Sequence, residues 1–134
     1  MDEHAFLVRT DQFESITPQP FFINPRCFGA DFSHWLSAAL RARGITVGGA
    51  IAEDWGWLLP VTHEDRPYHI SIGIMDSSIG MQPAEWRLGV APVTGLASLR
   101  QRTRGPSSLA LDGLTAAVEA TLGSEPRFTS VVRE

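Results

Sequence analysis

The feature that most constrains the fold of this chain is a pair of alternating apolar runs around a short polar segment. Residues 53–61 and 68–75 flank the segment His63-Glu64-Asp65-Arg66, an arrangement typical of a β-hairpin. With Glu64-Asp65 at the tip, apolar side chains oppose one another as Val61 with Tyr68, Leu59 with Ile70, Trp57 with Ile72 and Trp55 with Ile74. These side chains share one face, and a shift of one residue would bury the opposite set, so the pattern also predicts the register.

The clearest helix is predicted between residues 30 and 43. An apolar stripe recurs there at helical spacing, formed by Phe28, Phe32, Trp35, Leu36, Ala39 and Leu40. Asp31 lies in the first turn and Arg41 in the last, and both positions suit the helix dipole. Gly44 then supplies a typical C-terminal stop.

Further segments complete a mixed pattern of strands and helices. Strands are predicted at Ala5–Arg9, Ile45–Ala52, Glu85–Ala91 and Phe128–Val132. A second helix is expected to begin at Ser107 or Ser108, either of which can cap it, and to run to about residue 122. The strand expected at 45–52 has a centre of small residues, which indicates a bulge or the close approach of another group.

The segment Thr10–Arg26 is predicted to be an extended, proline-rich connection. Pro18, Pro20 and Pro25 exclude a helix through most of it, because each proline removes a backbone donor and fixes its own φ. The apolar residues 20–23 are expected to lie extended across the core. A connection of this length is unusual in a compact domain unless it is packed or functional.

Together these elements predict a single α+β domain over residues 1–134. We expect a largely antiparallel sheet of about five or six strands, with two helices packed mainly on one face, in the order β-α-β-β-β-β-α-β. The helices should cover the face that carries Trp55 and Trp57. The other face is mixed rather than polar, and an exposed apolar patch on it would favour self-association.

Composition excludes several classes of protein. The chain has 134 residues, of which 43% are hydrophobic and 19% charged, values typical of a globular domain. A net charge of −4 argues against nucleic acid as a partner. No apolar run is long enough to span a bilayer, and the N-terminus is acidic where a secretory signal is basic. We therefore expect a cytoplasmic protein that binds neither membrane nor nucleic acid.

All eleven basic residues are arginine. The absence of lysine excludes a phosphate-binding loop of the Walker type and a Schiff-base lysine. The four histidines show no metal-ligand spacing, and the single cysteine forms no thiolate pair. We therefore expect no metal and no cofactor. Cys27, beside Arg26 and near a helix start, is either a reactive thiol or a small buried hydrophobe.

The segment Glu53-Asp54-Trp55-Gly56-Trp57 holds the main candidates for a binding site. The two indoles could stack on a ligand while the two carboxylates accept hydrogen bonds, or both tryptophans could belong to the core. Strand parity places Glu53 on the tryptophan face, where a buried carboxylate needs a partner. Arg87 or one of the arginines after residue 99 could provide that partner.

Two further groups of side chains extend this set. His69 lies on the opposite face of the hairpin and joins the candidates for ligand or partner binding. Arg100, Arg102 and Arg104 form a small basic cluster that could bind a phosphate or an acidic partner, although clusters of this kind are usually solvated.

Three functions remain open from the sequence. The preferred one is a non-catalytic binding or protein-interaction domain, in which a homodimer is possible. The second is a small hydrolase or isomerase that uses Glu53 or Asp54 as general base, with His69 or Arg87 as helper. The third is a small-molecule sensor, with a cleft where glycines thin the sheet.

Overall fold

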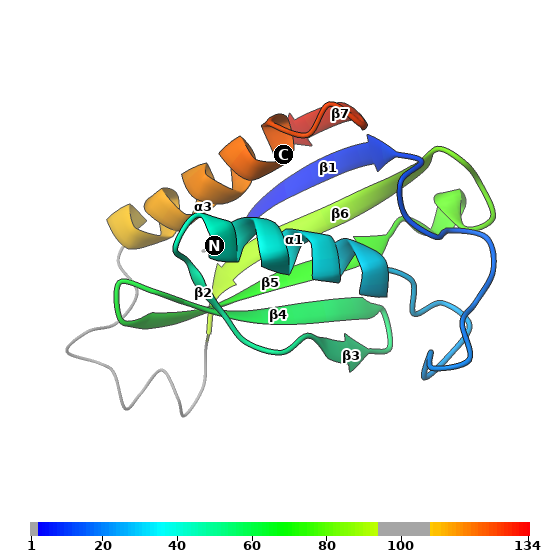
Figure 1. Cartoon of the computed structure of the whole chain (residues 1–134), viewed down its shortest axis with the longest axis horizontal. Helices are drawn as coiled ribbons and strands as arrows, with labels where there is room; N and C mark the ends of the chain where they lie inside the picture. The colour runs from blue at the N-terminus through cyan, green and yellow to red at the C-terminus, as the bar shows by residue number, and fades with distance from the viewer. Residues whose placement is uncertain (1–2, 94–107) are drawn as a thin grey trace.

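The computed structural model describes residues 3–93 and 108–134, which form one layer of sheet covered by two helices (Figure 1). The sheet has seven antiparallel strands in the order β2-β4-β5-β6-β1-β7, with β3 also paired to β4. The elements along the chain are β1 (His4–Thr10), α1 (Ala30–Ala42), β2 (Thr46–Val47), β3 (Ile51–Glu53), β4 (Gly56–His63), β5 (Arg66–Ile74), a 3₁₀ turn η1 (Asp76–Ser78), β6 (Ala84–Pro92), α3 (Ser108–Gly123) and β7 (Phe128–Arg133).

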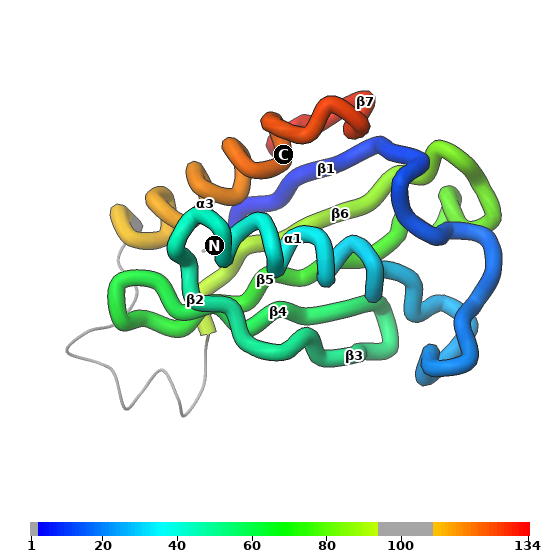
Figure 2. The backbone as a smooth tube through the Cα atoms, in the orientation of Figure 1, coloured from blue at the N-terminus to red at the C-terminus, as the bar shows by residue number. Residues whose placement is uncertain are grey.

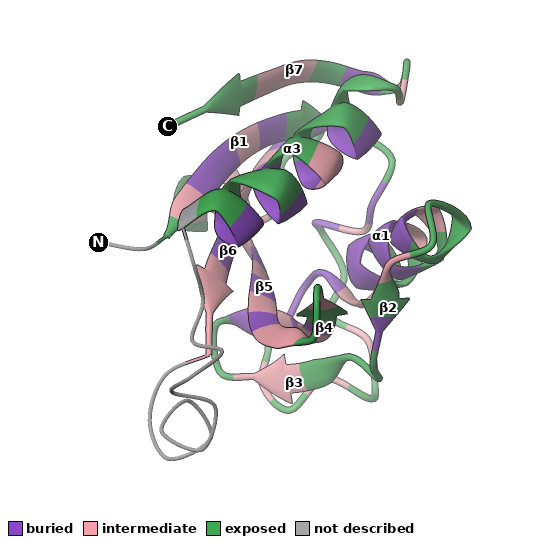
Figure 3. Ribbon diagram, turned by 90° about the vertical axis from the view of Figure 1, so that its left-hand side faces the viewer, coloured by how far each residue is buried: buried purple, intermediate pink, exposed green. Residues whose placement is uncertain are grey.

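The predicted α+β class and the order of elements are confirmed, with one change in the number of strands. The single strand expected at residues 45–52 is two short strands, β2 and β3, and both pair with β4. The chain leaves the ladder between them at Gly48-Gly49-Ala50, because these small residues offer the sheet no side chains to pack. Both helices lie on the same face of the sheet (Figures 1 and 3).

The central hairpin has the predicted register. Trp57 pairs with Ile72, Leu59 with Ile70 and Val61 with Tyr68. Glu64 and Asp65 form the tip with φ values of 51° and 61°, the left-handed geometry of a turn that matches the twist of a two-residue hairpin. The alternating apolar side chains of β4, β5 and β6 face the helices and build the core.

An aromatic cluster joins α1 to the sheet. Phe32 of α1 is fully buried, and its ring centroid lies 4.3 Å from that of Phe13, 5.5 Å from Trp86 and 5.7 Å from Phe128. These partners come from the first connection, from β6 and from β7, so one helical side chain ties together segments far apart in the sequence. Such buried aromatic contacts stabilise a core beyond the area they bury.

The connection from Thr10 to Arg26 runs around one end of the sheet before it enters α1 (Figure 2). It contains no helix, as predicted. The expectation that residues 20–23 cross the core is wrong, because Phe21 and Ile23 are 60% and 57% exposed. A turn, in which the Phe22 amide donates to the Gln19 carbonyl over 3.0 Å, directs only Phe22 against the core.

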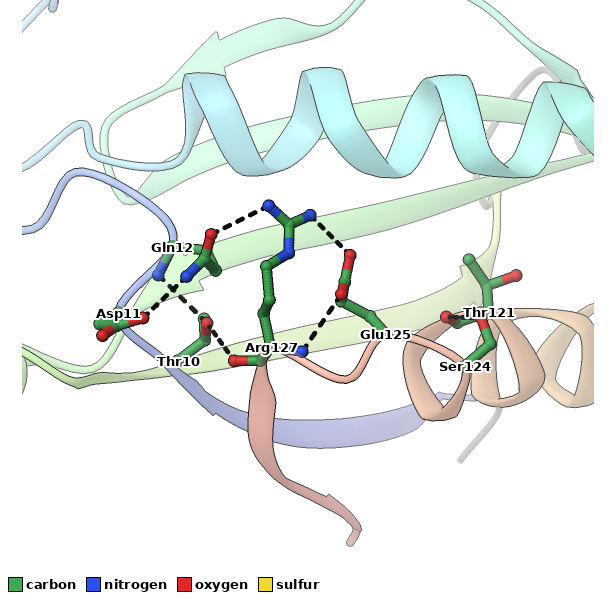
Figure 4. Close-up of polar contacts among 7 residues, drawn as sticks. All are labelled: Thr10, Asp11, Gln12, Thr121, Ser124, Glu125 and Arg127. Carbon is green, nitrogen blue, oxygen red and sulfur yellow. Dashed lines mark hydrogen bonds and ion pairs between the residues drawn. The ribbon is translucent and has the colours of Figure 1, made fainter.

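A polar network joins the end of β1 to the start of β7 (Figure 4). The buried Thr10 hydroxyl donates to the Arg127 carbonyl over 3.1 Å, and the Arg127 guanidinium donates to Gln12 and Glu125. The register between the two strands shifts between Arg9 and Thr10, which is the geometry of a β-bulge. These bonds hold the bulged end of the sheet where the ladder is interrupted.

Candidate functional site

The face of the sheet away from the helices is the natural place for a site, because no described element covers it (Figure 3). Along β5 the buried residues facing the helices alternate with His69, Ser71 and Gly73, which are half-buried. Small residues also mark the middle of this face in the neighbouring strands, since Gly89 of β6 pairs with Ala5 of β1. We call this surface the helix-free face.

Trp55 lies at one end of the helix-free face. The structure contradicts the prediction that Trp55 faces Ile74 within the hairpin and shares a face with Trp57. Glu53 pairs with Gly56, so Asp54 and Trp55 form the turn between β3 and β4, and Trp55 is 47% exposed. The alternation of side chains between the two faces of the sheet begins only at Gly56, the first residue of β4. The φ of Gly56 is +153°, in a region that is essentially restricted to glycine.

Two glycines fix the position of the Trp55 turn. A Cβ on Gly56 would overlap the carbonyl oxygen of Ile72, and a Cβ on Gly73 would lie 3.2 Å from the Trp55 carbonyl oxygen and 3.8 Å from the indole carbon Cε3. The turn therefore rests directly on the backbone of β5. Because neither glycine carries a side chain, the indole can lie against the sheet surface.

The end of the long connection supports the same turn. The Asn24 side-chain amide donates to the Asp54 carbonyl over 3.1 Å, and the Cys27 thiol lies 3.3 Å from the Glu53 carbonyl oxygen and 3.5 Å from that of Gly56. Cys27 is fully buried, and burial raises the pKa of its thiol. Of the two alternatives for Cys27, the structure therefore favours the buried residue over the reactive one.

Two cavities flank the Trp55 indole. One, of about 720 Å³, lies against the long connection and is lined by Asn24, Pro25, Arg26, Asp54, Trp55, Ile74 and Asp76. The other, of about 430 Å³, lies over the sheet and is lined by Glu3, Trp55, Ser71, Gly73, Ile74, Met75 and Arg87. Trp55 and Ile74 line both, so the two hollows are neighbours that share this tryptophan.

Charged side chains are paired at the rims of these cavities. In the larger one, Arg26 forms an ion pair with Asp76, whose carboxylate raises the pKa of the guanidinium. In the other, Arg87 pairs with Glu3 over 2.8 Å and with Glu134 over 3.4 Å. The sequence offered Arg87 or one of the arginines after residue 99 as a partner for Glu53, and the structure pairs Arg87 with two carboxylates from near the two ends of the chain instead.

Glu53 and His69 share the helix-free face. Glu53 pairs with Gly56, which neighbours Trp57, so it lies on the face opposite Trp57, and the prediction that it shares the tryptophan face is wrong. Burial lowers the pKa of His69, and the negative charge of Glu53 opposes this by raising it. The two groups are therefore close enough to interact electrostatically, although the structure gives no hydrogen bond between them.

The structure brings together some of the six predicted site residues and separates others. Asp54, Trp55 and Arg87 line the cavities, Glu53 and His69 share the face, and Trp57 faces the helices instead. The Trp57 indole donates to the Cys27 carbonyl over 3.1 Å. Sequence reasoning missed the cavity residues Glu3, Asn24, Arg26, Ser71, Met75 and Asp76. For Asn24 and Arg26, the only signal in the sequence was the unusual length of the connection that carries them.

Several other expectations concern metals, membranes and the basic cluster. Within residues 3–93 and 108–134, no three His, Cys, Asp or Glu side chains come together as a metal-binding group. Among the helices of those residues, none is long and apolar enough to cross a membrane. Arg100, Arg102 and Arg104 lie outside the described residues.

No protein-family model matches the chain, and no match is found among curated proteins or solved structures.

Proposed function

We propose that this chain is a non-catalytic, cytoplasmic binding domain that recognises a protein partner through the helix-free face, with Trp55 at the centre of the contact. The surface comprises the two cavities and the sheet between Ser71 and Arg87. Recognition by a domain of this kind requires a rigid base, an exposed anchor and hollows that accept side chains of the partner.

The observation that carries the proposal is the exposed indole of Trp55 on a turn that rests on β5. A tryptophan that is 47% exposed while its turn rests on the backbone of Gly73 presents a large apolar surface at little cost in conformational entropy. Tryptophan and arginine are the residues most enriched among those that dominate binding energy in protein interfaces. Arg26 lines one of the two cavities that share Trp55, and Arg87 lines the other.

The arrangement of the cavities supports a polypeptide as the occupant. Two hollows that share Trp55 and Ile74 suit a ligand that passes over the indole and places one group on each side. Successive side chains of an extended peptide have this form. The ion pairs at the rims are at least partly exposed, and charges in such positions influence specificity and association rate more than affinity.

A small-molecule sensor is the second candidate, and the cavity of about 430 Å³ over Gly73 favours it. Its volume lies within the range of small-ligand sites, roughly 300 to 1,000 Å³. A sensor would retain its ligand during native mass spectrometry, as extra mass that disappears on denaturation. A retained adduct of small mass would replace the protein-partner proposal with this one.

Site-specific photocrosslinking tests the proposed function. A benzophenone amino acid replaces Met75, which lines the cavity over the sheet, so that Trp55 itself stays intact. The matched control carries the same group at Ala38, an exposed residue of α1 on the other side of the sheet. Irradiation in cells of the source organism should give a discrete protein adduct from position 75 and none of the same mass from position 38.

The adduct is then tested for dependence on Trp55. Trp55→Ala should abolish the crosslink from position 75, and with the purified partner it should weaken binding at least about tenfold, the loss expected of a dominant contact residue. Identical adducts from both positions, or a crosslink that survives Trp55→Ala, would show that the helix-free face is not the binding surface.

A further inference from the structure

On the other side of the sheet, α1 passes beside the segment between β2 and β3 (Figures 1 and 3). Residues of both segments line a further cavity. This hollow has a volume of about 300 Å³ and is lined by Ala30, Ser33, His34, Ser37, Arg41, Gly48, Gly49, Ala50 and Trp57. It shares no lining residue with the cavities around Trp55. Nothing in the proposed function uses it.

One polar stripe of α1 faces this hollow. Ser33, Ser37 and Arg41 recur at a spacing of four residues, so they lie one above another on the same side of the helix. The neighbouring stripe, which includes Phe32, Leu36 and Leu40, is fully buried in the core. Helix packing alone explains the apolar stripe but gives no reason for polar side chains beside it.

The Ser37 hydroxyl is one group that a ligand in the hollow could contact. Ser37 is 7% exposed and lines the hollow, and the structure gives its side chain no hydrogen bond within the described part of the chain. Among those residues the buried side-chain atoms without a partner are the Tyr68 hydroxyl and the Trp86 indole nitrogen, so the Ser37 hydroxyl is accessible from the hollow and can bond to a ligand there. The Ser33 hydroxyl, one turn earlier, does bond, to the Ala30 carbonyl over 2.8 Å.

The Arg41 guanidinium, on an exposed residue, is a second such group. Its guanidinium donates to the Val47 carbonyl over 2.9 Å, which anchors the side chain at the start of the Gly48-Gly49-Ala50 segment. Among the described residues no carboxylate pairs with it. A guanidinium has five N–H donors, so the anchored side chain keeps several for a ligand, and their planar fork matches a carboxylate or phosphate.

The backbone opposite α1 completes the cavity wall. Gly49 and Ala50 are exposed, and within the described residues their amides have no backbone acceptor. A Cβ on Gly49 would meet no atom within 4 Å. Gly48 is fixed by its amide bond to the Pro60 carbonyl, over 2.8 Å. Two unpaired amides beside a guanidinium and a free hydroxyl all donate hydrogen bonds, so they suit an acceptor that carries negative charge.

We propose that this hollow, between α1 and the β2–β3 segment, binds the carboxylate or phosphate group of a small organic anion. Arg41 and Ser37 hold the oxygens, His34 lies at the rim, and the body of the ligand lies against Trp57. The indole is held in place by its bond to the Cys27 carbonyl. A volume of about 300 Å³ limits the ligand to the small end of the usual range.

Nuclear magnetic resonance of the ¹⁵N-labelled chain tests this proposal with two probes, inorganic phosphate and benzoate. Each is titrated against sodium chloride at matched ionic strength, and the amides of Gly49 and Ala50 and the indole N–H of Trp57 are followed. A saturable shift of these signals with either probe is expected, and the probe that binds tells a phosphate from a carboxylate ligand. Absence of saturable shifts with both would overturn the proposal.

Matched variants assign the binding to the named residues. Arg41→Gln should weaken binding of the probe at least about tenfold, the effect expected when a charged hydrogen bond is lost. Arg43→Gln removes an equal charge outside the hollow and should change the affinity for the probe less than about twofold. Because Arg41 also anchors Val47, Ser37→Ala and Gly49→Leu provide independent tests that leave this bond intact. Equal losses in the two arginine variants, or unchanged affinity in both Ser37→Ala and Gly49→Leu, would contradict the site.

Discussion

At the scale of single residues, two glycines determine where Trp55 lies, which the pattern of apolar residues did not predict correctly. Gly56 allows the turn that carries Trp55 to rest on β5, and Gly73 leaves space for the indole above the sheet. Neither effect can be predicted from the alternation of apolar residues. That alternation shows which side chains are apolar, but it does not show where the fold leaves no space for a side chain. The position of the proposed anchor therefore depends on residues with no chemistry of their own.

Replacing Gly56 with alanine should destabilise the protein by about 3 kcal/mol, since strained backbone and overpacking each cost about 1 to 3 kcal/mol. The new Cβ would overlap the Ile72 carbonyl, and the φ of +153° disfavours any side chain. Gly49→Ala is the control, because a Cβ there meets open space, and its effect should stay within about 0.5 kcal/mol. Urea denaturation measures both, and similar losses in the two variants would contradict the role given to Gly56.

His69 should make stability depend on pH. Burial lowers the pKa of His69 from its ordinary 6.5, against the opposing charge of Glu53. On acidification the unfolded chain therefore binds this proton before the folded chain does. The stability contributed by neutral His69 is fully present above about pH 6.5 and is lost as the pH falls through its lower folded pKa.

The measurement for His69 is the free energy of unfolding by urea at about pH 7.5 and about pH 5.5, on either side of the ordinary histidine pKa. His69→Gln should lose less stability between these two values than the unchanged protein loses. His34→Gln, at an exposed histidine of α1, should lose as much as the unchanged protein. If His69→Gln lost as much stability as the control on acidification, the assignment would be wrong.

At the scale of elements, α1 and the central hairpin hold the fold together, and both were predicted from the sequence. The helix stripe and the hairpin register follow from local periodicity, which the structure keeps wherever one face of an element is buried. Predictions failed where the chain departs from a regular element. Parity placed Trp55 and Glu53 wrongly because β4 begins only at Gly56, and Phe21 and Ile23 face solvent because a turn precedes them.

The candidate site was predicted less completely than the fold for the same reason. Asp54, Trp55 and Arg87 were identified by residue type, but their grouping depends on contacts between distant segments. Asn24 reaches the Asp54 carbonyl from thirty positions earlier in the chain, and no local pattern records such a contact. Glu3 and Glu134 likewise pair with Arg87 from near the two ends of the chain.

Truncation of Phe32 tests how α1 is attached to the sheet. Phe32→Ala should lower the free energy of unfolding by about 3 to 5 kcal/mol, the usual cost of removing a buried phenylalanine ring, because the ring contacts Phe13, Trp86 and Phe128. His34→Ala changes an exposed residue of the same helix and should cost no more than about 0.5 kcal/mol. Chemical denaturation followed by circular dichroism compares the two, and a loss below about 1 kcal/mol in Phe32→Ala would argue against the cluster as the anchor.

At the scale of the whole molecule, the candidate site combines the parts of the fold that have the most backbone pairing with parts that are held by few hydrogen bonds. Its floor comes from β5 and β6, which are central strands paired on both sides. Its walls come from the β3–β4 turn and from the connection around Asn24, which is held by a few side-chain bonds such as that to the Asp54 carbonyl. Free energies of local opening vary in the same way, from near zero in loops to the global value in central strands.

Hydrogen exchange should reveal this difference directly. Amides of residues 69–73 and 86–90, which belong to the ladders of the central strands, should exchange only on global unfolding, and their rates should fall with every change that raises overall stability. Amides of residues 24–26 and 54–55 should exchange through local opening and should respond little to such changes. A partner that binds only the folded protein raises its free energy of unfolding, so its addition should slow exchange in β5 and β6 as well. A partner bound over Trp55 should in addition slow the amides of residues 24–26 and 54–55, because it restricts their local opening. Slowing in β5 and β6 without slowing at residues 24–26 and 54–55 would mean that the partner binds the folded protein but does not contact the Trp55 turn.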